Sequence, residues 1–300
     1  MHNFLLYVIT VLIWGTTWFA IKMQVGLAPT DVSITYRTIL AAILLVGLCK
    51  SKGFSLRFRL QDHFFVCALG LSMFSLHQLF VYGASQYLVS GVVSVVFSSV
   101  SFLSVFYNYL FFKTKPTLNI ILGVIIGILG LCIFFWDEVS HLSLESDTVL
   151  GIEMALCGSC IFALGGIISK RNHRQGIETM PSIAMGMVYG AMASLIYTLI
   201  HGSSFVFPVS WGYWGSLMYL VIFGSIVAFL CYLKLIKNMG PELAGYTSVL
   251  FPAVALFVSF ILEGYEGSLN DFIGFSFVLI GNILVMRKKP VFELKQESFA

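Results

Sequence analysis

Ten runs of mainly apolar residues, each about 20 residues long, dominate this chain and leave little sequence between them. They lie at about 4–22, 32–49, 64–84, 88–112, 118–136, 149–169, 181–200, 212–236, 242–262 and 271–286. A helix that crosses a bilayer needs about 20 such residues. Charged residues make up only 10% of the 300 residues, whereas soluble domains have about 25%. The runs predict an all-α integral membrane protein with ten transmembrane helices.

The basic residues predict how these helices are oriented. Fifteen of the 17 Lys and Arg residues fall in alternate loops and in the C-terminal tail. The intervening loops are acidic or neutral, as with Asp137 and Glu138 after the fifth run and Glu263 and Glu266 after the ninth. Because loops rich in Lys and Arg are usually cytoplasmic, both termini are expected in the cytoplasm. The first run lacks a preceding basic segment and a small-residue cleavage site, so we expect it to remain as a helix.

An internal repeat of about 150 residues groups the ten runs into two sets. SGVVSVVFSS at 90–99 aligns with AGYTSVLFPA at 244–253, and GVIIGILG at 123–130 aligns with GFSFVLIG at 274–281. Each match is short, but the matches keep the same order and nearly the same spacing. This pattern indicates two copies of one structural unit.

Each copy holds five predicted helices, and this odd number sets the second copy upside down relative to the first. Equivalent loops accordingly carry opposite charge bias. We predict two inverted five-helix repeats, at 1–147 and 148–289, followed by a cytoplasmic tail at 290–300. Secondary transporters commonly use inverted repeats and bind substrate near the membrane midplane between them.

Three motifs carry a resemblance to a known family. They are WGTTW at 14–18, R-x-x-x-A at Arg37–Ala41, and the stretch at 248–281 with Pro252 and Glu266. With the five-plus-five repeat, they resemble the EamA-type transporters of the drug/metabolite transporter superfamily. The resemblance covers nearly the whole chain. It implies an inner-membrane carrier of small metabolites, with a central cavity lined by both halves.

The first predicted helix carries bulky rings around a polar residue. Trp14, Thr17 and Trp18 fall at i, i+3 and i+4, so they share one face of a helix. We expect this face to line the central cavity and to contact substrate. The alternative is that the rings only pack against neighbouring helices.

Further candidates come from polar side chains in the third, fourth and eighth predicted helices, because polar groups in lipid usually face the bundle interior. The candidates for substrate binding there are Gln78, Tyr82, Ser94, Phe97, Ser98 and Tyr232. For the two serines, the alternative is that small residues allow close helix packing and that their hydroxyls bond across the interface or back to their own chain.

The ninth predicted helix contains the candidate that the sequence favours most. Pro252 removes the backbone hydrogen bond to residue 248 and bends the helix. A carbonyl freed at membrane depth must find a partner in protein, water or ligand. Tyr246 and Ser248 are therefore predicted to bind substrate, and Pro252 is predicted to act in gating.

Three ionisable residues within the apolar runs are candidates for gating or coupling. Arg37 and Glu153 are predicted near the outer surface, where they could pair across the two halves or gate the outer mouth. Arg37 could also extend its charged end to that surface. His77 could titrate in a proton-linked step, or it could simply be hydrogen-bonded between helices.

These patterns predict a secondary transporter, an exporter or exchanger, of small organic metabolites, with amino acids or related compounds as the leading class. The rings of the candidate residues suit such substrates. Protons and a second copy of the chain, in a homodimer, are further candidate partners. No clustered His, Asp and Glu residues indicate a metal or an enzyme, no cofactor is expected, and the short basic clusters do not indicate nucleic-acid binding.

One alternative has no transport activity. The chain could be a lipid-handling or accessory membrane subunit that binds a partner through G-x-x-x-G helix faces such as Gly123 and Gly127. A closed polar cavity would argue against this alternative.

Overall fold

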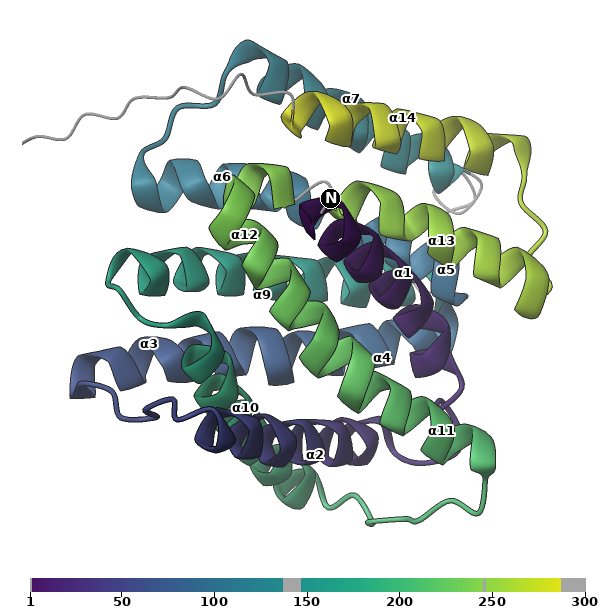
Figure 1. Cartoon of the computed structure of the whole chain (residues 1–300). Helices are drawn as coiled ribbons and strands as arrows, with labels where there is room; N and C mark the ends of the chain where they lie inside the picture. The colour runs from purple at the N-terminus through teal and green to yellow at the C-terminus, as the bar shows by residue number, and fades with distance from the viewer. Residues whose placement is uncertain (1, 137–146, 245–246, 287–300) are drawn as a thin grey trace, which may run out of the picture.

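The computed structural model describes residues 2–136, 147–244 and 247–286, and throughout these ranges the regular structure is helical, with no strand (Figure 1). Seven continuous helical segments are long and apolar enough to cross a membrane. Three further apolar helices are shorter, at Leu118–Phe134, Leu250–Leu262 and Leu269–Leu284. The chain is a multi-pass membrane protein. Each of these ten helices overlaps one of the predicted runs, and the count of ten crossings stays a prediction because three of the helices are short.

The described part of the first half contains eight helical elements. They are α1 (His2–Lys22), α2 (Thr30–Ser51), α3 (Leu60–Leu71), η1 (Ser72–Leu76), α4 (His77–Tyr87), α5 (Ser90–Phe97), α6 (Val100–Phe112) and α7 (Leu118–Phe134). The elements α3, η1 and α4 run on as one rod, and α5 and α6 form a second.

The second half follows a similar order. Its described elements are α9 (Asp147–Arg174), α10 (Thr179–His201), α11 (Trp211–Tyr219), η2 (Leu220–Val227), α12 (Ala228–Ala244), α13 (Thr247–Leu262) and α14 (Leu269–Met286). Here α11, η2 and α12 form one rod, which crosses the face of the bundle in Figure 1.

A π-helical segment interrupts the third rod of each half, η1 in the first half and η2 in the second. Each segment contacts the second helix of the other half through a serine. The Ser194 hydroxyl of α10 donates to the Ser75 hydroxyl of η1 at 2.9 Å, and Arg37 Nε of α2 donates to the Ser225 hydroxyl of η2 at 3.0 Å. Since π-helical turns inside α-helices often mark functional sites, the region between η1 and η2 is a candidate binding site.

The helices α7 and α14 pack together at one side of the bundle (Figure 1). Glycines make the close approach possible: a Cβ added at Gly281 would lie 2.6 Å from the Gly123 carbonyl oxygen and 2.5 Å from the Gly127 amide nitrogen. The G-x-x-x-G face predicted for partner binding is therefore used inside the chain. It is not available to a partner protein.

Candidate functional site

A cavity of about 1420 Å³ lies between the two halves of the bundle. Residues of α1, α2, η1, α4, α5, α6 and α7 line it from the first half, and residues of α9, α10, η2, α12 and α13 line it from the second. Small-molecule pockets typically measure about 300–1000 Å³. The cavity therefore has room for a metabolite and for a water-filled path to it.

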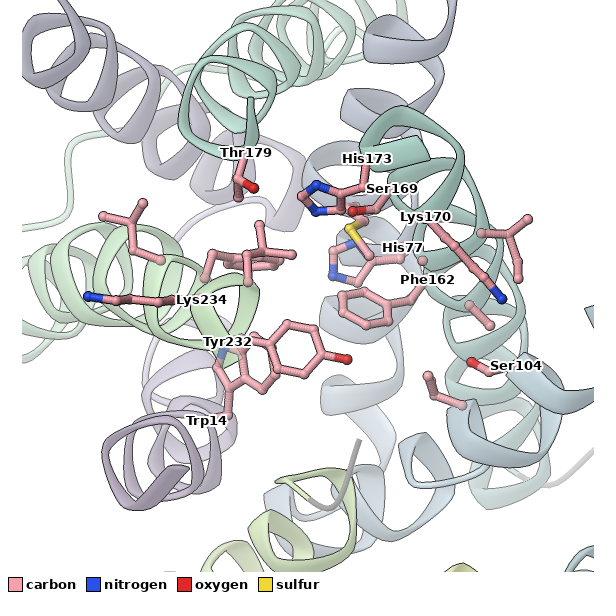
Figure 2. Close-up of a pocket in the computed structure, with 18 of the residues that line it drawn as sticks. Trp14, His77, Ser104, Phe162, Ser169, Lys170, His173, Thr179, Tyr232 and Lys234 are labelled. Atoms are coloured by element: carbon pink, nitrogen blue, oxygen red, sulfur yellow. The ribbon is translucent and has the colours of Figure 1, made fainter. Parts of the chain in front are cut away.

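Aromatic rings form two opposite walls. Trp14 packs against Tyr232 and Phe229, with ring centroids 4.8 Å and 5.4 Å apart. Figure 2 shows Trp14 and Tyr232 on one side of the cavity, with His77 and Phe162 across from them. Such walls suit a substrate with an apolar or aromatic body.

Further rings close the cavity at depth. The Trp18 ring lies 5.0 Å from that of Phe97 and 5.9 Å from that of Phe251, and the rings of Phe97 and Phe162 are 5.1 Å apart. All four side chains line the cavity, and all except Phe162 are buried. We refer to Trp18, Phe97, Phe162 and Phe251 as the aromatic floor.

Several polar groups lie close to the aromatic floor. Arg37, Thr17 and Gln78 line the cavity and are buried, with Arg37 only 6% exposed. Arg37 and Thr17 come together against Gly224, because a Cβ at that glycine would lie 3.5 Å from Arg37 Nη2 and 2.9 Å from Thr17 Cγ2. Gln78 Oε1 and Trp18 Nε1 are buried without a hydrogen-bond partner. Because buried polar atoms are normally paired, these two atoms are candidates for ligand contact.

His77 also lines the cavity, at the point where η1 joins α4. Its Nδ1 lies 3.0 Å from the Ser72 carbonyl oxygen, a partner that the π-helical turn brings within reach. Its ring packs against Phe162 and Phe97, with centroids 5.1 Å and 6.3 Å apart. His77 is thus both hydrogen-bonded within its own rod and in contact with the cavity.

The cavity extends to one end of the bundle, where most of its lining residues are charged or polar. The lining cations at this mouth are Lys52, Lys115, Lys170, Arg174 and Lys234, whereas one acidic residue, Glu178, accompanies them. Lys170 Nζ donates to Asn108 Oδ1 at 2.8 Å, which ties α9 to α6 beside the mouth. The entrance is therefore predominantly basic.

The opposite end of the bundle is closed by polar contacts between helices. Lys22, the last residue of α1, donates to the carbonyl oxygens of Ser85 at 2.7 Å and Leu88 at 3.2 Å, at the end of α4. Tyr82 donates to Gln24 Oε1 at 3.1 Å, and Gln24 Nε2 donates to the Ser216 hydroxyl at 3.3 Å. The first three contacts join α1 and the segment after it to α4 within the first half, and the Gln24–Ser216 contact joins the two halves.

A carboxylate adds a second set of contacts at this closed end. Glu263, just after α13, accepts hydrogen bonds from the Ser90 amide at 3.1 Å and from the Ser90 hydroxyl at 2.5 Å. The Ser259 hydroxyl also donates to Glu263, and it accepts from the Gly91 amide at 2.8 Å. A carboxylate at this position stabilises the N-terminus of α5, where backbone N–H groups lack helical partners. We call Glu263, Ser259, Ser90 and Gly91 the α5 clasp.

The structure places some predicted site residues outside the cavity. Tyr82 is 1% exposed and belongs to the closed end. Ser94 and Ser98 are fully buried, and their hydroxyls donate to the carbonyl oxygens of Gly91 and Val95 in their own helix. Helix packing, the alternative interpretation of these serines, accounts for both positions.

The outer ion pair considered for Arg37 and Glu153 is not formed. Arg37 donates to Ser225 deep in the bundle instead of extending to the surface, and the Glu153 side chain is exposed on α9. Of the predicted gating residues, Arg37 and His77 line the cavity, whereas Glu153 does not.

The structure describes only part of the segment around Pro252 that was predicted to bind substrate. Pro252 lies inside α13 and is buried, and its neighbour Phe251 lines the cavity. Tyr246 and the side chain of Ser248 lie outside the described residues. Phe251 and Phe162 were not among the predicted site residues. The repeat also aligns FALGGIISK at 162–170 with WGTTWFAIK at 14–22, which pairs Phe162 with Trp14 and could have indicated Phe162.

Comparison with known proteins gives the family. The model of the EamA-like transporter family matches residues 3–136 and 149–287. The chain belongs to this family. It is therefore a membrane transporter by family, which agrees with the resemblance of its motifs and implies a small-molecule substrate.

Relatives from three organisms span almost the whole chain. The "uncharacterized inner membrane transporter YedA" of Escherichia coli K12 is 27% identical over 95% of this chain and 90% of its own length. An uncharacterized transporter of Archaeoglobus fulgidus is 25% identical over 96% of this chain and 100% of its own. Protein PagO of Salmonella typhimurium is 24% identical over 96% of this chain and 94% of its own.

A solved crystal structure has a similar fold, with a TM-score of 0.71 over 94% of this chain and 96% of that one. Its sequence identity is 15%, so the likeness concerns the fold alone. Within the described ranges, no group of three or more His, Cys, Asp or Glu side chains could hold a metal ion.

Proposed function

We propose that this protein is a secondary transporter that moves small organic metabolites, with amino acids or related compounds as the leading class, by alternating access. One observation carries the proposal: the cavity reaches one end of the bundle, while polar contacts between helices close the other. A carrier needs such an arrangement, because substrate must reach its site from one side at a time.

The proposed mechanism uses two inverted five-helix repeats, 1–147 and 148–289, that rock against each other around the cavity. Two features support it. The family model matches twice, at 3–136 and 149–287. The serine contacts of η1 and η2 are also equivalent in the two halves, since each reaches the second helix of the other half. Rocking would exchange such contacts between halves while each half stays packed.

The proposed orientation follows from the charged loops. Lys and Arg residues gather at the mouth of the cavity, and cytoplasmic loops carry such residues. We assign the mouth to the cytoplasm, together with both termini and the tail at 290–300, and the α5 clasp to the outside. In this assignment the structure represents an inward-open state. The protein would lie in the cell's inner membrane, as the name of its E. coli relative says of that protein.

A proton could be coupled to transport through His77, which is the imidazole that lines the deep part of the cavity. Exchange without a proton is the other arrangement that the site allows. A transport rate that depends on an imposed pH gradient separates the two. The exposed Glu153 does not face the cavity, so it is not part of this proposal.

The accessory-subunit alternative loses its main support in this structure. The G-x-x-x-G face of α7 packs against α14, so it cannot bind another protein. A cavity that both halves line, with a basic mouth, also has no role in a purely structural subunit.

The test is transport by the purified protein in liposomes preloaded with unlabelled metabolite. Labelled amino acids, nucleobases and simple organic acids are then offered outside, and counterflow is measured. The proposal predicts accumulation of at least one of them above protein-free liposomes. Failure of every metabolite in the panel would reject it.

A further inference from the structure

Among the described residues that line the cavity, Arg37 is the buried cation. It is only 6% exposed, whereas Lys52, Lys115, Arg174 and Lys234 are exposed at the mouth. Burial of a guanidinium is costly unless an anion and hydrogen bonds compensate it. The buried charge of Arg37 therefore needs a compensating partner, whereas the exposed charges at the mouth are solvated by water.

Among the residues that the structure describes, the hydrogen-bond partner of this charge is neutral. Arg37 Nε donates to the Ser225 hydroxyl at 3.0 Å. In the part of the chain that the structure describes, the ion pair is between Arg171 and Asp62, remote in sequence from Arg37. A guanidinium has five N–H donors in a planar fork that matches a carboxylate. Arg37 can therefore accept an anionic ligand from the cavity.

The surroundings select the rest of the ligand. The aromatic floor and the Trp14 ring offer flat apolar surfaces beside Arg37. Trp18 Nε1 is a buried donor without a partner, and it suits a second oxygen of the same ligand. The described lining contains six Lys and Arg residues but one acidic residue, Glu178 at the mouth, so a cationic group would meet net repulsion.

We propose that Arg37 binds the carboxylate of the substrate, and that the transported class is organic acids with an apolar or aromatic body rather than organic cations. This inference rests on the transporter function proposed above and narrows it. The carboxylate lies at Arg37 and Trp18, and the body of the molecule lies against Trp14 and the aromatic floor. Both zwitterionic amino acids and simple organic acids carry a carboxylate. The experiment below distinguishes these two classes of ligand.

Three probes that share one phenyl ring test the assignment: 3-phenylpropionate, phenylalanine and phenethylamine, which are an anion, a zwitterion and a cation. Binding to the purified protein is measured by tryptophan fluorescence and by thermal shift. We expect 3-phenylpropionate to bind at least as tightly as phenylalanine, and phenethylamine not to bind. Equal binding of phenethylamine, or absence of binding by both carboxylates, would overturn the proposal.

Variants then assign the effect to one residue. Arg37→Gln is expected to weaken binding of 3-phenylpropionate on the order of 10- to 100-fold, and Arg37→Lys to restore part of it, because the charge returns without the fork. Ser225→Ala removes the hydrogen bond between Arg37 and Ser225 but keeps the guanidinium. It therefore controls for a loss of binding caused only by loss of this structural contact. It should retain the preference for carboxylates over phenethylamine. Wild-type binding in Arg37→Gln would refute the assignment.

Lys50→Gln is the matched control, since this exposed lysine lies on the same helix and outside the cavity. It removes one positive charge and should leave binding unchanged; a loss equal to that of Arg37→Gln would mean that net charge alone acts. Transport separates this inference from the broader one. Counterflow of organic cations would retain the transporter and reject the role of Arg37, whereas absence of counterflow for metabolites of every charge would reject the transporter.

Discussion

The α5 clasp makes a quantitative prediction about the closed end of the cavity. In Glu263→Gln, one carboxylate oxygen becomes an NH2 group that faces the donors of Ser90 and Ser259. Hydrogen bonds to a charged group contribute about 1.5–3 kcal/mol. Loss of charge on this acceptor should therefore destabilise the closed end by about 1.5–3 kcal/mol, which shifts the ratio of open to closed forms about 10- to 150-fold.

The assay measures access to a buried position at the closed end. Leu88 is 6% exposed and its side chain is not required by the contact from Lys22, which uses the Leu88 carbonyl oxygen. We would place Leu88→Cys in a protein whose six native cysteines have been replaced, and measure its labelling by a maleimide in detergent. Labelling should be slow, and Glu263→Gln should speed it by about tenfold or more.

Glu266→Gln provides the control for that experiment. It makes the same chemical change three residues away, where the side chain is exposed. Labelling of Leu88→Cys should be unchanged in this variant. If Glu263→Gln also left the labelling rate within about twofold of the parent, the clasp would contribute too little to hold the end closed.

Three further predictions follow from the packing and the cavity lining. Gly70→Ala should lower the thermal unfolding temperature or prevent folding, since a Cβ there would collide with the Gly186 carbonyl oxygen, whereas Gly47→Ala meets open space and should not. Trp14→Leu should raise the half-saturating substrate concentration in counterflow about 2- to 10-fold by removing an aromatic wall, and an unchanged value would assign this ring to packing. His77→Gln should abolish dependence of transport on an imposed pH gradient while counterflow persists; dependence that survives would place the proton elsewhere.

Periodicity along single helices predicted part of the site. Trp14, Thr17 and Trp18 share a face by their spacing, and all three line the cavity. Gln78, Phe97 and Tyr232 also line it. A polar or aromatic face in an apolar helix needs an interior environment, and that requirement can be derived from the residue types alone.

Periodicity could not tell which interior face meets a cavity and which meets another helix. Ser94 lies on a polar face of α5, but that element packs closely on α13, where a Cβ at Gly91 would lie 2.9 Å from Leu256 Cα. The serine hydroxyls then bond to their own helix. This outcome depends on the distance between two helices that are far apart in sequence, which residue spacing does not encode.

The partners of charged residues could not be predicted for a related reason. Glu263 was predicted only as part of an acidic loop, and its side chain accepts hydrogen bonds from Ser90 at the N-terminus of α5. Arg37 bonds to Ser225 of the opposite half instead of Glu153. In both residues the partner comes from the other repeat. Contacts between the repeats, which the chain order alone does not fix, therefore decide the chemistry of the site.

A substitution that fills the cavity tests most directly that substrate passes through it. Gly166 lines the cavity, and a Cβ added there meets nothing within 4 Å, so Gly166→Trp can be accommodated without a backbone clash. Gly47→Trp places the same side chain on the exposed face of α2, also in open space and away from the cavity. We predict that counterflow in liposomes is lost in Gly166→Trp and retained in Gly47→Trp, with both proteins folded. Full counterflow in Gly166→Trp would contradict transport through this cavity.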